Sequence, residues 1–304
     1  MPAFATPSEH LTLLRDPART LAYRAAIFAH ARDRVVLDLG CGSGVLSIFA
    51  AQAGARKIYA VERTQIASLA RMMFKANSVS DRVVLLRGES STIELPEQAD
   101  LIIHEIFGTD PLAEGLVPAI DDARTRLLKP GGRLLPGRVE VLCIGLEASN
   151  LSLAGARMAR QAAQLSAMYG VDFSPFEMAM NTSPSVLSAS GRHAQEQLEG
   201  LLTDEALLFD LDLGRSLAEQ IAHAHEFDLE ARTDGRLGRV LIFFRAHLDE
   251  MTAISTSPYA PRTHWSWTVY DLARAITVEE GQRVRLRAQV QTVDGVQRVV
   301  VDLI

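Results

Sequence analysis

Hydrophobic and polar residues alternate along the first part of the chain in a pattern that predicts strands separated by helices. Short apolar runs that end in glycine or charge are typical of buried parallel strands. Between them, apolar residues recur at helical spacing. This βαβαβ order predicts an α/β fold, a parallel sheet with helices on both faces. The expected strands are residues 35–40, 57–62, 82–88 and 100–107, and the expected helices are 44–54, 65–77 and 117–128, the last one stopped by Pro130, Gly131 and Gly132.

The pattern changes after Gly137. Short runs with period-two alternation follow one another without long helices between them, which predicts an antiparallel barrel or sandwich. The segment Asn150–Met168 differs, because it is rich in Ala, Met, Leu and Gln and predicts an inserted helix within an arm over about 150–205. Two domains are therefore expected, 1–136 and 137–304. The expected antiparallel strands are 138–145, 208–213, 225–231, 239–248, 268–272, 283–290 and 298–304.

Composition narrows the classes of function. The chain has 304 residues with 31 Lys and Arg against 37 Asp and Glu, a net charge of −6. This balance argues against a general binder of nucleic acid or anionic membrane, which gathers excess basic residues. Cys41 and Cys143 are too few for a disulfide framework or a Cys-rich metal site. With no basic region followed by an apolar run at the start, and no apolar run of membrane length, a cytoplasmic protein is expected.

Three glycines follow Asp38 where the first strand passes into the first helix, in the spacing Gly40-x-Gly42-x-Gly44. Glycine lets the backbone turn sharply there and approach a ligand closely. The spacing is neither the G-x-G-x-x-G of a dinucleotide loop nor a triphosphate loop ending in G-K-[ST]. Glu62 ends the second strand, where an acid can bind both hydroxyls of a ribose. The combination resembles the S-adenosylmethionine (SAM) methyltransferases, and the alternative is a turn that serves packing alone.

Glu105 and Glu114 flank a loop after the fourth strand. Gly108 and Pro111 interrupt any helix between them, so a loop is expected to turn both carboxylates toward one point. Converging carboxylates need a cation, a metal or a shared proton to offset their repulsion. A planar guanidinium fits best, because it offers paired donors in a fork, whereas His104 points away from Glu105 and completes no metal site. The alternative is two solvated loop acids.

Four motifs in order along the chain resemble the protein arginine methyltransferases. In chain order, Leu13–Tyr23 is similar to the family's N-terminal signature and Val36–Glu62 to its glycine-loop segment. His104–Glu114 is similar to its double-E loop, and the segment that ends at Trp265 to its Thr-His-Trp loop. The resemblance covers nearly the whole chain. It implies a Rossmann-like SAM-binding domain followed by a β-barrel, with a helical arm that makes a homodimer. The implied substrate is an arginine-containing protein or peptide, and the acidic composition leaves nucleic acid and membrane out as expected partners.

SAM is the cofactor that the resemblance implies. Arg19 would pair with its methionine carboxylate, although a surface ion pair between Arg19 and Asp16 is the alternative. Glu62 would hold the ribose, and Glu89 or Ser91 stands near the place of the family's adenine-contacting acid. The full set of expected cofactor residues is Arg19, Asp38, Gly40, Gly42, Gly44, Glu62, Glu89 and Ser91.

The resemblance also implies the residues that act on the substrate. Glu105 and Glu114 would hold the guanidinium, and Asp16 and His264 would form a carboxylate–imidazole pair beside it. A histidine of the core or of a turn is the alternative for His264. The remaining residues are expected to contact the substrate, the first of them also closing the site over the cofactor; these are Tyr23 and Trp265.

Departures from the family pattern leave alternatives open. His104 replaces a serine and Ile106-Phe107 replaces a Trp-Met pair, and with Glu114-Gly115 this loop is more similar to the monomethylating, type III branch. A methyltransferase of free arginine or another small guanidine is one alternative, and a SAM-binding scaffold without catalysis is another. A DNA amino-methyltransferase is disfavoured because no [DN]-P-P-[YFW] tetrapeptide follows the fourth strand, and an NAD oxidoreductase is disfavoured by the glycine spacing.

Overall fold

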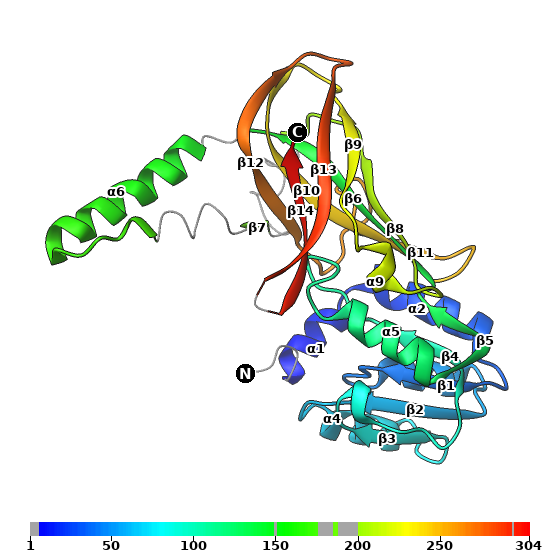
Figure 1. The fold of residues 1–304 in the computed structure, drawn as a ribbon. Coiled ribbons are helices and arrows are strands. Elements are labelled where there is room, and N and C mark those ends of the chain that lie inside the picture. The colour runs from blue at the N-terminus through cyan, green and yellow to red at the C-terminus, as the bar shows by residue number, and fades with distance from the viewer. Residues whose placement is uncertain (1–5, 149–150, 176–184, 188–199, 294) are drawn as a thin grey trace.

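A computed structural model describes residues 6–148, 151–175, 185–187, 200–293 and 295–304. The N-terminal half of the chain forms a parallel sheet with helices, and the C-terminal half forms two antiparallel sheets. One helix extends away from all three sheets (Figure 1). No helix among these residues is long and apolar enough to cross a membrane. The change from parallel to antiparallel strands falls near residue 136, which supports the proposed domains 1–136 and 137–304.

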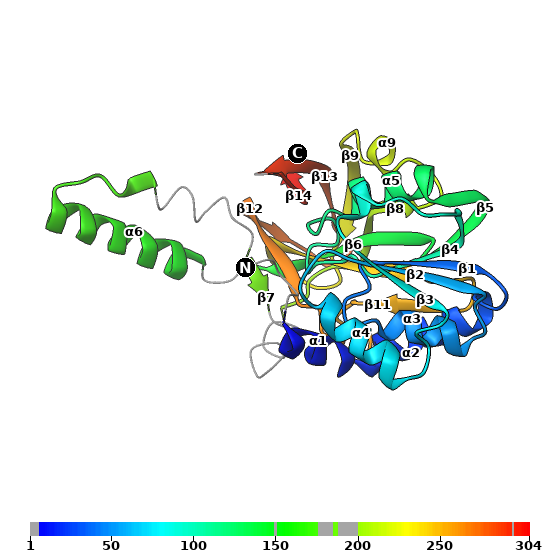
Figure 2. The ribbon, with the colours of Figure 1, turned by 90° about the horizontal axis from the view of Figure 1, so that it is seen from below.

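The parallel sheet has five strands in the order β3-β2-β1-β4-β5. Three helices, α2, α3 and α4, lie on one of its faces and α5 lies on the other (Figure 2). The strands are β1 (Val35–Leu39), β2 (Lys57–Glu62), β3 (Val83–Arg87), β4 (Ala99–His104) and β5 (Leu128–Leu135). The helices are α1 (Pro7–Leu14), α2 (Pro17–His30), α3 (Val45–Gln52), α4 (Ala67–Ala76) and α5 (Leu116–Arg126), with a short 3-10 turn, η1, at Ser90–Thr92.

The centre of this sheet is apolar on both sides. Every residue of β1 is buried, and the first three, Val35, Val36 and Leu37, have no exposed surface. Such runs form strands because helices cover both faces and no side needs to be polar. The strand order reverses between β1 and β4, so their carboxyl ends open side by side at a topological switch point. Ligands bind at this position in open α/β sheets.

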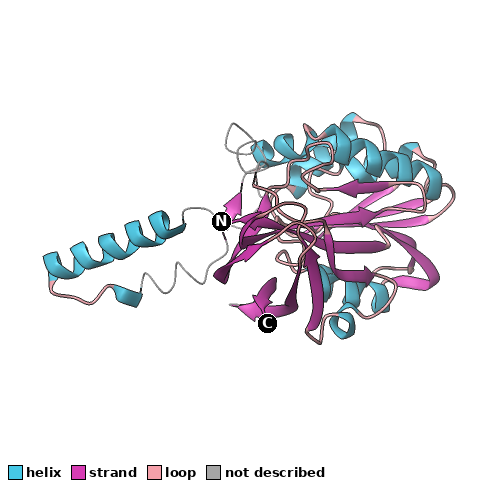
Figure 3. Cartoon of the chain, turned by 90° about the horizontal axis from the view of Figure 1, so that it is seen from above, coloured by secondary structure: helices cyan, strands magenta, loops and turns pink. Residues whose placement is uncertain are grey.

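The second half forms two antiparallel sheets, as predicted from its period-two pattern (Figure 3). One has the order β7-β12-β10-β6-β8 with β11 paired to β10, and the other has the order β14-β13-β9. Their closure into a barrel stays a prediction. The strands are β6 (Arg138–Glu147), β7 (Ser185–Leu187), β8 (Ala206–Asp212), β9 (His225–Glu230), β10 (Gly235–His247), β11 (Ala253–Ser255), β12 (Trp267–Val278), β13 (Arg283–Val293) and β14 (Val296–Leu303), with the short helix α9 at Leu217–Gln220.

Most predicted boundaries differ from the structure by a few residues, and two of the differences change the interpretation. The strand expected over 100–107 ends at His104, so Glu105 already belongs to the following loop. The segment expected only to stop a helix, Pro130 to Gly132, lies inside the edge strand β5. A proline is tolerated there because an edge strand needs hydrogen bonds on one side only, and the pairing of β5 with β4 is irregular at this point.

The predicted helix of the arm is present as α6 (Leu151–Tyr169), which projects away from both sheets (Figures 1 and 2). Near its end, Met168 and Tyr169 are large apolar side chains exposed to solvent. The rest of the predicted arm, up to residue 205, lies partly outside the described residues, at 176–184 and 188–199.

Candidate active site

The glycine loop turns the chain from β1 into α3 through three left-handed residues. Gly40, Gly42 and Gly44 have φ values of 75°, 54° and 82°, a region that side chains other than glycine rarely adopt. Packing adds a second reason at two of them, because a Cβ on Gly42 would overlap His10 of α1 and one on Gly44 would overlap Phe74 of α4. The loop therefore requires glycine at these positions and is closely covered, with His10 of α1 directly on it.

Glu62 joins the glycine loop to the end of β2. One carboxylate oxygen accepts a hydrogen bond from the backbone N–H of Gly42 at 3.0 Å, and the other accepts from the N–H of Thr64 at 2.6 Å. Each carboxylate oxygen has a second lone pair. Glu62 therefore keeps acceptor capacity for the hydroxyls of a ligand at the switch point.

Asp38 lies at the end of β1 with almost no exposed surface. Burial raises the pKa of Asp38 to about 6, and the negative charge of Glu62 adds to this, although a hydrogen bond donated by the Ser47 hydroxyl at 2.6 Å opposes it. Desolvation favours the neutral form of a carboxyl group. An acidic side chain in this position strengthens the case for a ligand that supplies donors or positive charge.

Glu89 and Ser91 lie farther out at the same edge. Glu89 forms an exposed ion pair with Arg63 at 3.3 Å, a contact worth about 1 kcal/mol or less. Ser91 is exposed within the short turn η1. Neither contacts the glycine loop through its side chain in this structure, so their expected adenine contacts stay a proposal.

Asp16 and His264, which are far apart in the sequence, form the carboxylate–imidazole pair that the motifs predict. Asp16 is the N-cap of α2, and one of its oxygens accepts from the backbone N–H of Arg19 at 3.0 Å. The other oxygen accepts from the backbone N–H of His264 at 2.8 Å and lies 3.0 Å from its Nδ1. Burial would raise the pKa of Asp16, but the hydrogen bonds from His264 and Arg19 outweigh it and lower the pKa.

Arg19 projects from α2 to the double-E loop. Its Nη2 donates to Oε2 of Glu105 at 2.6 Å, and the two side chains are only 6% and 12% exposed. Nε and Nη1 of Arg19 are buried and have no acceptor among the described residues. An unsatisfied buried donor costs about 1–3 kcal/mol. The alternative ion pair with Asp16 does not form, because Asp16 accepts from the backbone of Arg19 and not from its guanidinium.

Glu114 faces Glu105 across the loop. The Glu114 side chain is open to solvent on one side. Partial desolvation by the surrounding protein, together with the negative charge of Glu105, raises the pKa of Glu114 to about 7. Gly108 allows the loop to fold back, since a Cβ there would lie 3.2 Å from Cγ of Glu114. The charge of Glu105 acts on Glu114 strongly enough to raise the pKa of Glu114, so the loop does bring both acids together.

Asp110 anchors this loop to the antiparallel half, a role that the sequence analysis missed. Its carboxylate accepts from the backbone N–H of Leu112 at 3.2 Å and of Val299 in β14 at 3.3 Å. Burial raises the pKa of Asp110 to about 6. The Asp-Pro sequence could have indicated the turn, since aspartate often hydrogen-bonds the backbone two residues on. His10 over the glycine loop had no such signal.

Tyr23 is placed differently from its expected role. It has no exposed surface, and its hydroxyl donates to the carbonyl oxygen of His104 at 2.8 Å. A side chain buried under the end of β4 cannot close over a cofactor, so Tyr23 instead supports the strand that leads to Glu105. The His104 ring is also buried, 3.3 Å from the Pro136 carbonyl, and burial lowers the pKa of His104 to about 4.

Trp265 is also buried, and its indole N–H donates to the carbonyl oxygen of Phe107 at 2.8 Å. Its ring lies 4.0 Å from the His264 ring, while Phe107 stacks on Phe244 of β10. Trp265 therefore links the Thr-His-Trp loop to the double-E loop, which places His264 near Glu105. The expected contact of Trp265 with substrate stays a proposal.

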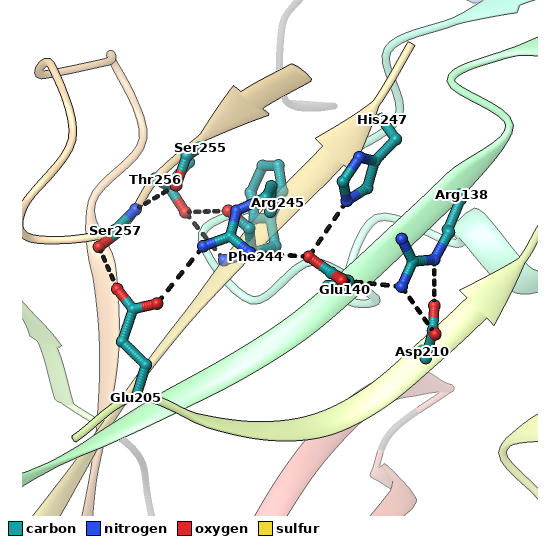
Figure 4. Close-up of polar contacts among 10 residues, drawn as sticks. All are labelled: Arg138, Glu140, Glu205, Asp210, Phe244, Arg245, His247, Ser255, Thr256 and Ser257. Atoms are coloured by element: carbon teal, nitrogen blue, oxygen red, sulfur yellow. Dashed lines mark hydrogen bonds and ion pairs between the residues drawn. The ribbon is translucent and has the colours of Figure 1, made fainter. Parts of the chain in front are cut away.

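A second charged cluster lies on one face of the larger antiparallel sheet (Figure 4). Its centre is Glu140 of β6, which contacts Arg138 at 2.8 Å, Arg245 at 2.9 Å and His247 at 3.1 Å. Arg245 also lies 3.4 Å from Glu205, whose other oxygen accepts from the Ser257 hydroxyl at 2.6 Å. We call this set, completed by Asp210 on Arg138, the sheet-face network. No group of His, Cys, Asp and Glu among the described residues is arranged to hold a metal ion.

Known proteins place the chain in a family. A family model described as "Arginine methyltransferase oligomerization subdomain" matches residues 158–300, and one described as "Ribosomal protein L11 methyltransferase (PrmA)" matches residues 25–137. Protein arginine N-methyltransferase 1 of Schizosaccharomyces pombe is 31% identical over 283 residues, which cover 91% of this chain and 79% of that protein. This chain belongs to the protein arginine methyltransferase family. It is thus a SAM-dependent arginine N-methyltransferase by family.

Other relatives agree with this assignment. Protein arginine N-methyltransferase 6 of Danio rerio is 31% identical over 90% of this chain and 79% of its own length. The structure titled "Trypanosoma brucei PRMT1 enzyme-prozyme heterotetrameric complex with AdoHcy" is similar with a TM-score of 0.83 and 27% identity, covering all of this chain and 95% of that one. A structure of Arabidopsis thaliana protein arginine methyltransferase 10 has a TM-score of 0.82 at 25% identity, covering 96% and 90% of the two chains.

The residues at the switch point fit SAM as the cofactor of a protein arginine methyltransferase. The glycine loop leaves the backbone free to approach a ligand, and Glu62 keeps lone pairs for hydroxyl groups. Arg19 carries buried guanidinium nitrogens that still need an acceptor, and a carboxylate would satisfy them. The cofactor residues other than Glu89 and Ser91 lie in β1 and β2, in the glycine loop and in the first turn of α2, around the carboxyl ends of β1 and β2.

Proposed function

We propose that this protein arginine methyltransferase transfers one methyl group to a terminal guanidine nitrogen of an arginine in a protein or peptide, using Glu105 and Glu114 to hold the guanidinium. One observation carries the proposal: the Glu105 carboxylate already binds a guanidinium, that of Arg19, at 2.6 Å. With Glu114 beside it, the site has two carboxyl groups and one guanidinium in contact with them, and the charge of Arg63 only partly offsets this surplus of acid. A second guanidinium would relieve this surplus.

The reaction requires positioning more than activation. When bound, SAM supplies a methyl group on a positively charged sulfur, ready for transfer. Glu105 and Glu114 orient the guanidinium and draw its positive charge toward themselves, which leaves electron density on the nitrogen that faces the methyl group. The arginine side chain has a pKa above about 12, so its proton leaves during or after transfer. Glu114, whose pKa is about 7, or the Asp16–His264 pair accepts it.

The packing of the double-E loop supports a single methylation. Ile106 stands where the family pattern has tryptophan. Its Cγ1 lies 4.0 Å from the point that a Cβ on Gly40 would occupy, so the side chain points toward the glycine loop. Phe107 next to it is buried and held through its carbonyl by Trp265. A loop braced at both positions leaves little freedom to accept a guanidine that already carries a methyl group.

A dimer built by the arm completes the proposal. The exposed apolar side chains Leu165, Met168 and Tyr169 lie near the end of α6, which projects from the molecule. The matched family model carries oligomerization in its description and begins at residue 158, within α6. We expect light scattering to give twice the 33.2 kDa mass of the chain.

Mass spectrometry tests the reaction, its substrate and its product together. The protein is incubated with SAM and either an arginine-rich peptide or free arginine, and methyl groups added to each are counted over time. The proposal expects one methyl group per arginine on the peptide. Two methyl groups would contradict the single methylation, and product on free arginine alone would favour the small-guanidine alternative. Binding of SAM without transfer to either would favour a scaffold.

A further inference from the structure

Arg19 occupies the place that the proposed function gives to the substrate. Its guanidinium donates to Oε2 of Glu105 at 2.6 Å in the ligand-free protein. The same carboxylate is proposed to hold the arginine side chain that accepts the methyl group. The substrate guanidinium would hydrogen-bond the carboxylate that Arg19 Nη2 already contacts, so Glu105 cannot give its full hydrogen-bonding capacity to both.

The Arg19 contact is nonetheless incomplete. Nε and Nη1 are buried without an acceptor among the described residues, so only Nη2 has a side-chain partner. Arg19 also lies on α2 close to Asp38 and the glycine loop, as its electrostatic interaction with Asp38 shows. Its unsatisfied N–H groups would donate to a second anion on the cofactor side without a shift of α2.

We propose that Arg19 sets the order in which the two ligands bind, because it holds Glu105 until the cofactor carboxylate gives its guanidinium another partner. This inference rests on the proposed function and extends it. The Arg19 guanidinium then hydrogen-bonds the cofactor carboxylate in place of Glu105, and Glu105 becomes free for the arginine of the substrate. Arg19 is therefore a positioning residue that couples the two binding sites.

Coupling of this kind is reciprocal and measurable without turnover. If the cofactor carboxylate strengthens binding of the substrate, the substrate strengthens binding of the cofactor by the same factor. The effect depends on the amino-acid carboxylate and not on the adenosine part. S-adenosylhomocysteine carries that carboxylate but no methyl group to transfer, while methylthioadenosine keeps the adenosine and the sulfur and lacks the carboxylate.

The experiment measures binding of an arginine-rich peptide by titration calorimetry, alone and with each of these two compounds at saturation. Saturation is verified for each compound by its own titration. S-adenosylhomocysteine is expected to strengthen peptide binding by about tenfold, and methylthioadenosine to leave it unchanged. Equal strengthening by both compounds, or by neither, would overturn the proposal.

Variants locate the coupling. In Arg19→Gln the peptide should bind more tightly than to the wild type when no nucleoside is present, and S-adenosylhomocysteine should no longer change its affinity. Arg15→Gln is the matched control, because Arg15 is an exposed arginine four residues earlier, and it should keep the tenfold coupling. If Arg19→Gln keeps that coupling, Arg19 does not carry it. Should Arg19→Gln fold poorly, the wild-type comparison of the two compounds decides alone.

A failure of this inference is distinguishable from a failure of the proposed function. We call the two acids that hold the substrate guanidinium, Glu105 and Glu114, the clamp. Glu105→Gln should weaken peptide binding in the presence of S-adenosylhomocysteine, since the clamp then loses one charge. If it does so while the two compounds act alike on the wild type, the clamp stands and the role of Arg19 is refuted. If Glu105→Gln has no effect on peptide binding, the clamp itself is wrong.

Discussion

The loop after β4 and the sheet-face network both gather acidic and basic side chains, but they pair them differently. In the network, Glu140 contacts three cationic or potentially cationic side chains, and Asp210 receives two hydrogen bonds from Arg138 (Figure 4). At the loop, Glu105 has Arg19 alone, and no described residue donates a hydrogen bond to Glu114. One cluster is neutralised within the protein and the other is not.

The pKa values follow this difference. Although burial opposes it, hydrogen bonds from His247 and Arg245 lower the pKa of Glu140, and Arg138 lowers that of Asp210. The protein around the Glu114 carboxyl group and the neighbouring Glu105 instead raise the pKa of Glu114 to about 7. Because perturbed carboxyl groups without partners are concentrated at functional sites, the comparison separates a binding cluster from a structural one.

Removing the charge of Glu105 should have the largest effect. Glu105→Gln keeps the shape of the side chain and is expected to lower the rate of methyl transfer at least about 100-fold, because the guanidinium loses its principal anion. Initial rates with an arginine-rich peptide measure the loss. S-adenosylhomocysteine should bind to this variant at least as tightly as to the wild type, since Arg19 is freed. Near-normal rates would show that Glu105 does not hold the substrate.

The Asp16–His264 pair should have the next largest effect. Asp16→Asn retains a good N-cap for α2 but replaces one of the two acceptor oxygens by an amide donor, so His264 loses its orientation. We expect kcat to fall about 100-fold with little change in Tm. A fall in Tm that parallels the loss of rate would instead assign Asp16 a role in stability.

Titration of Glu114 should change the activity of the wild type near neutral pH. Below its pKa of about 7 the protonated carboxyl group no longer attracts a guanidinium, so kcat/KM should fall about tenfold per pH unit. In Glu105→Gln the repulsion that helps to raise this pKa is gone, and the midpoint for peptide binding should move to lower pH. A midpoint that stays in place would assign the titration to another group.

The raised pKa of Glu114 makes the folded protein less stable as pH rises, whereas it makes the enzyme more active. A carboxyl group with a folded pKa of about 7, above the ordinary glutamate value of 4.5, keeps its proton in the folded state while the unfolded state loses it. The free energy of unfolding therefore falls as pH rises through this window. Glu114→Gln, which is neutral at every pH, should have a higher Tm than the wild type at pH 8 and an equal Tm at pH 4.

Local patterns made the glycine loop and its strands predictable, while long-range pairing did not. The apolar run of β1 and the three glycines of left-handed φ leave a direct trace in the sequence. The contact between Arg19 and Glu105 does not, because many acids could face Arg19 and only the fold selects one. Likewise, the buried positions of Tyr23 and Trp265 depend on elements far apart in the chain.

The edge strand β5 shows the same limit in the fold. Pro130, Gly131 and Gly132 carry a strong local preference against regular structure, and the helix before them ends at Arg126, two residues earlier than predicted. Their inclusion in a strand follows from pairing with β4, which tolerates an irregular stretch at the edge of the sheet. Such a choice is made by the neighbouring strand, so the local sequence cannot indicate it.

The smallest effect is expected in the sheet-face network. Glu140→Gln removes ion pairs to partly exposed arginines, which together are worth about 1 kcal/mol of unfolding free energy. Thermal denaturation should show a slightly lower Tm, while the rate of methyl transfer stays at the wild-type value. A large loss of rate in Glu140→Gln would remove the distinction between the two clusters.

The most direct test places two matched substitutions side by side. Methyl transfer to an arginine-rich peptide is followed by intact mass for Glu105→Gln and Glu140→Gln, with binding of S-adenosylhomocysteine measured for each. We predict that both variants bind the compound, that Glu140→Gln adds one methyl group at the wild-type rate, and that Glu105→Gln adds none in the same time. Methylation by Glu105→Gln at the rate of Glu140→Gln would contradict the guanidinium clamp.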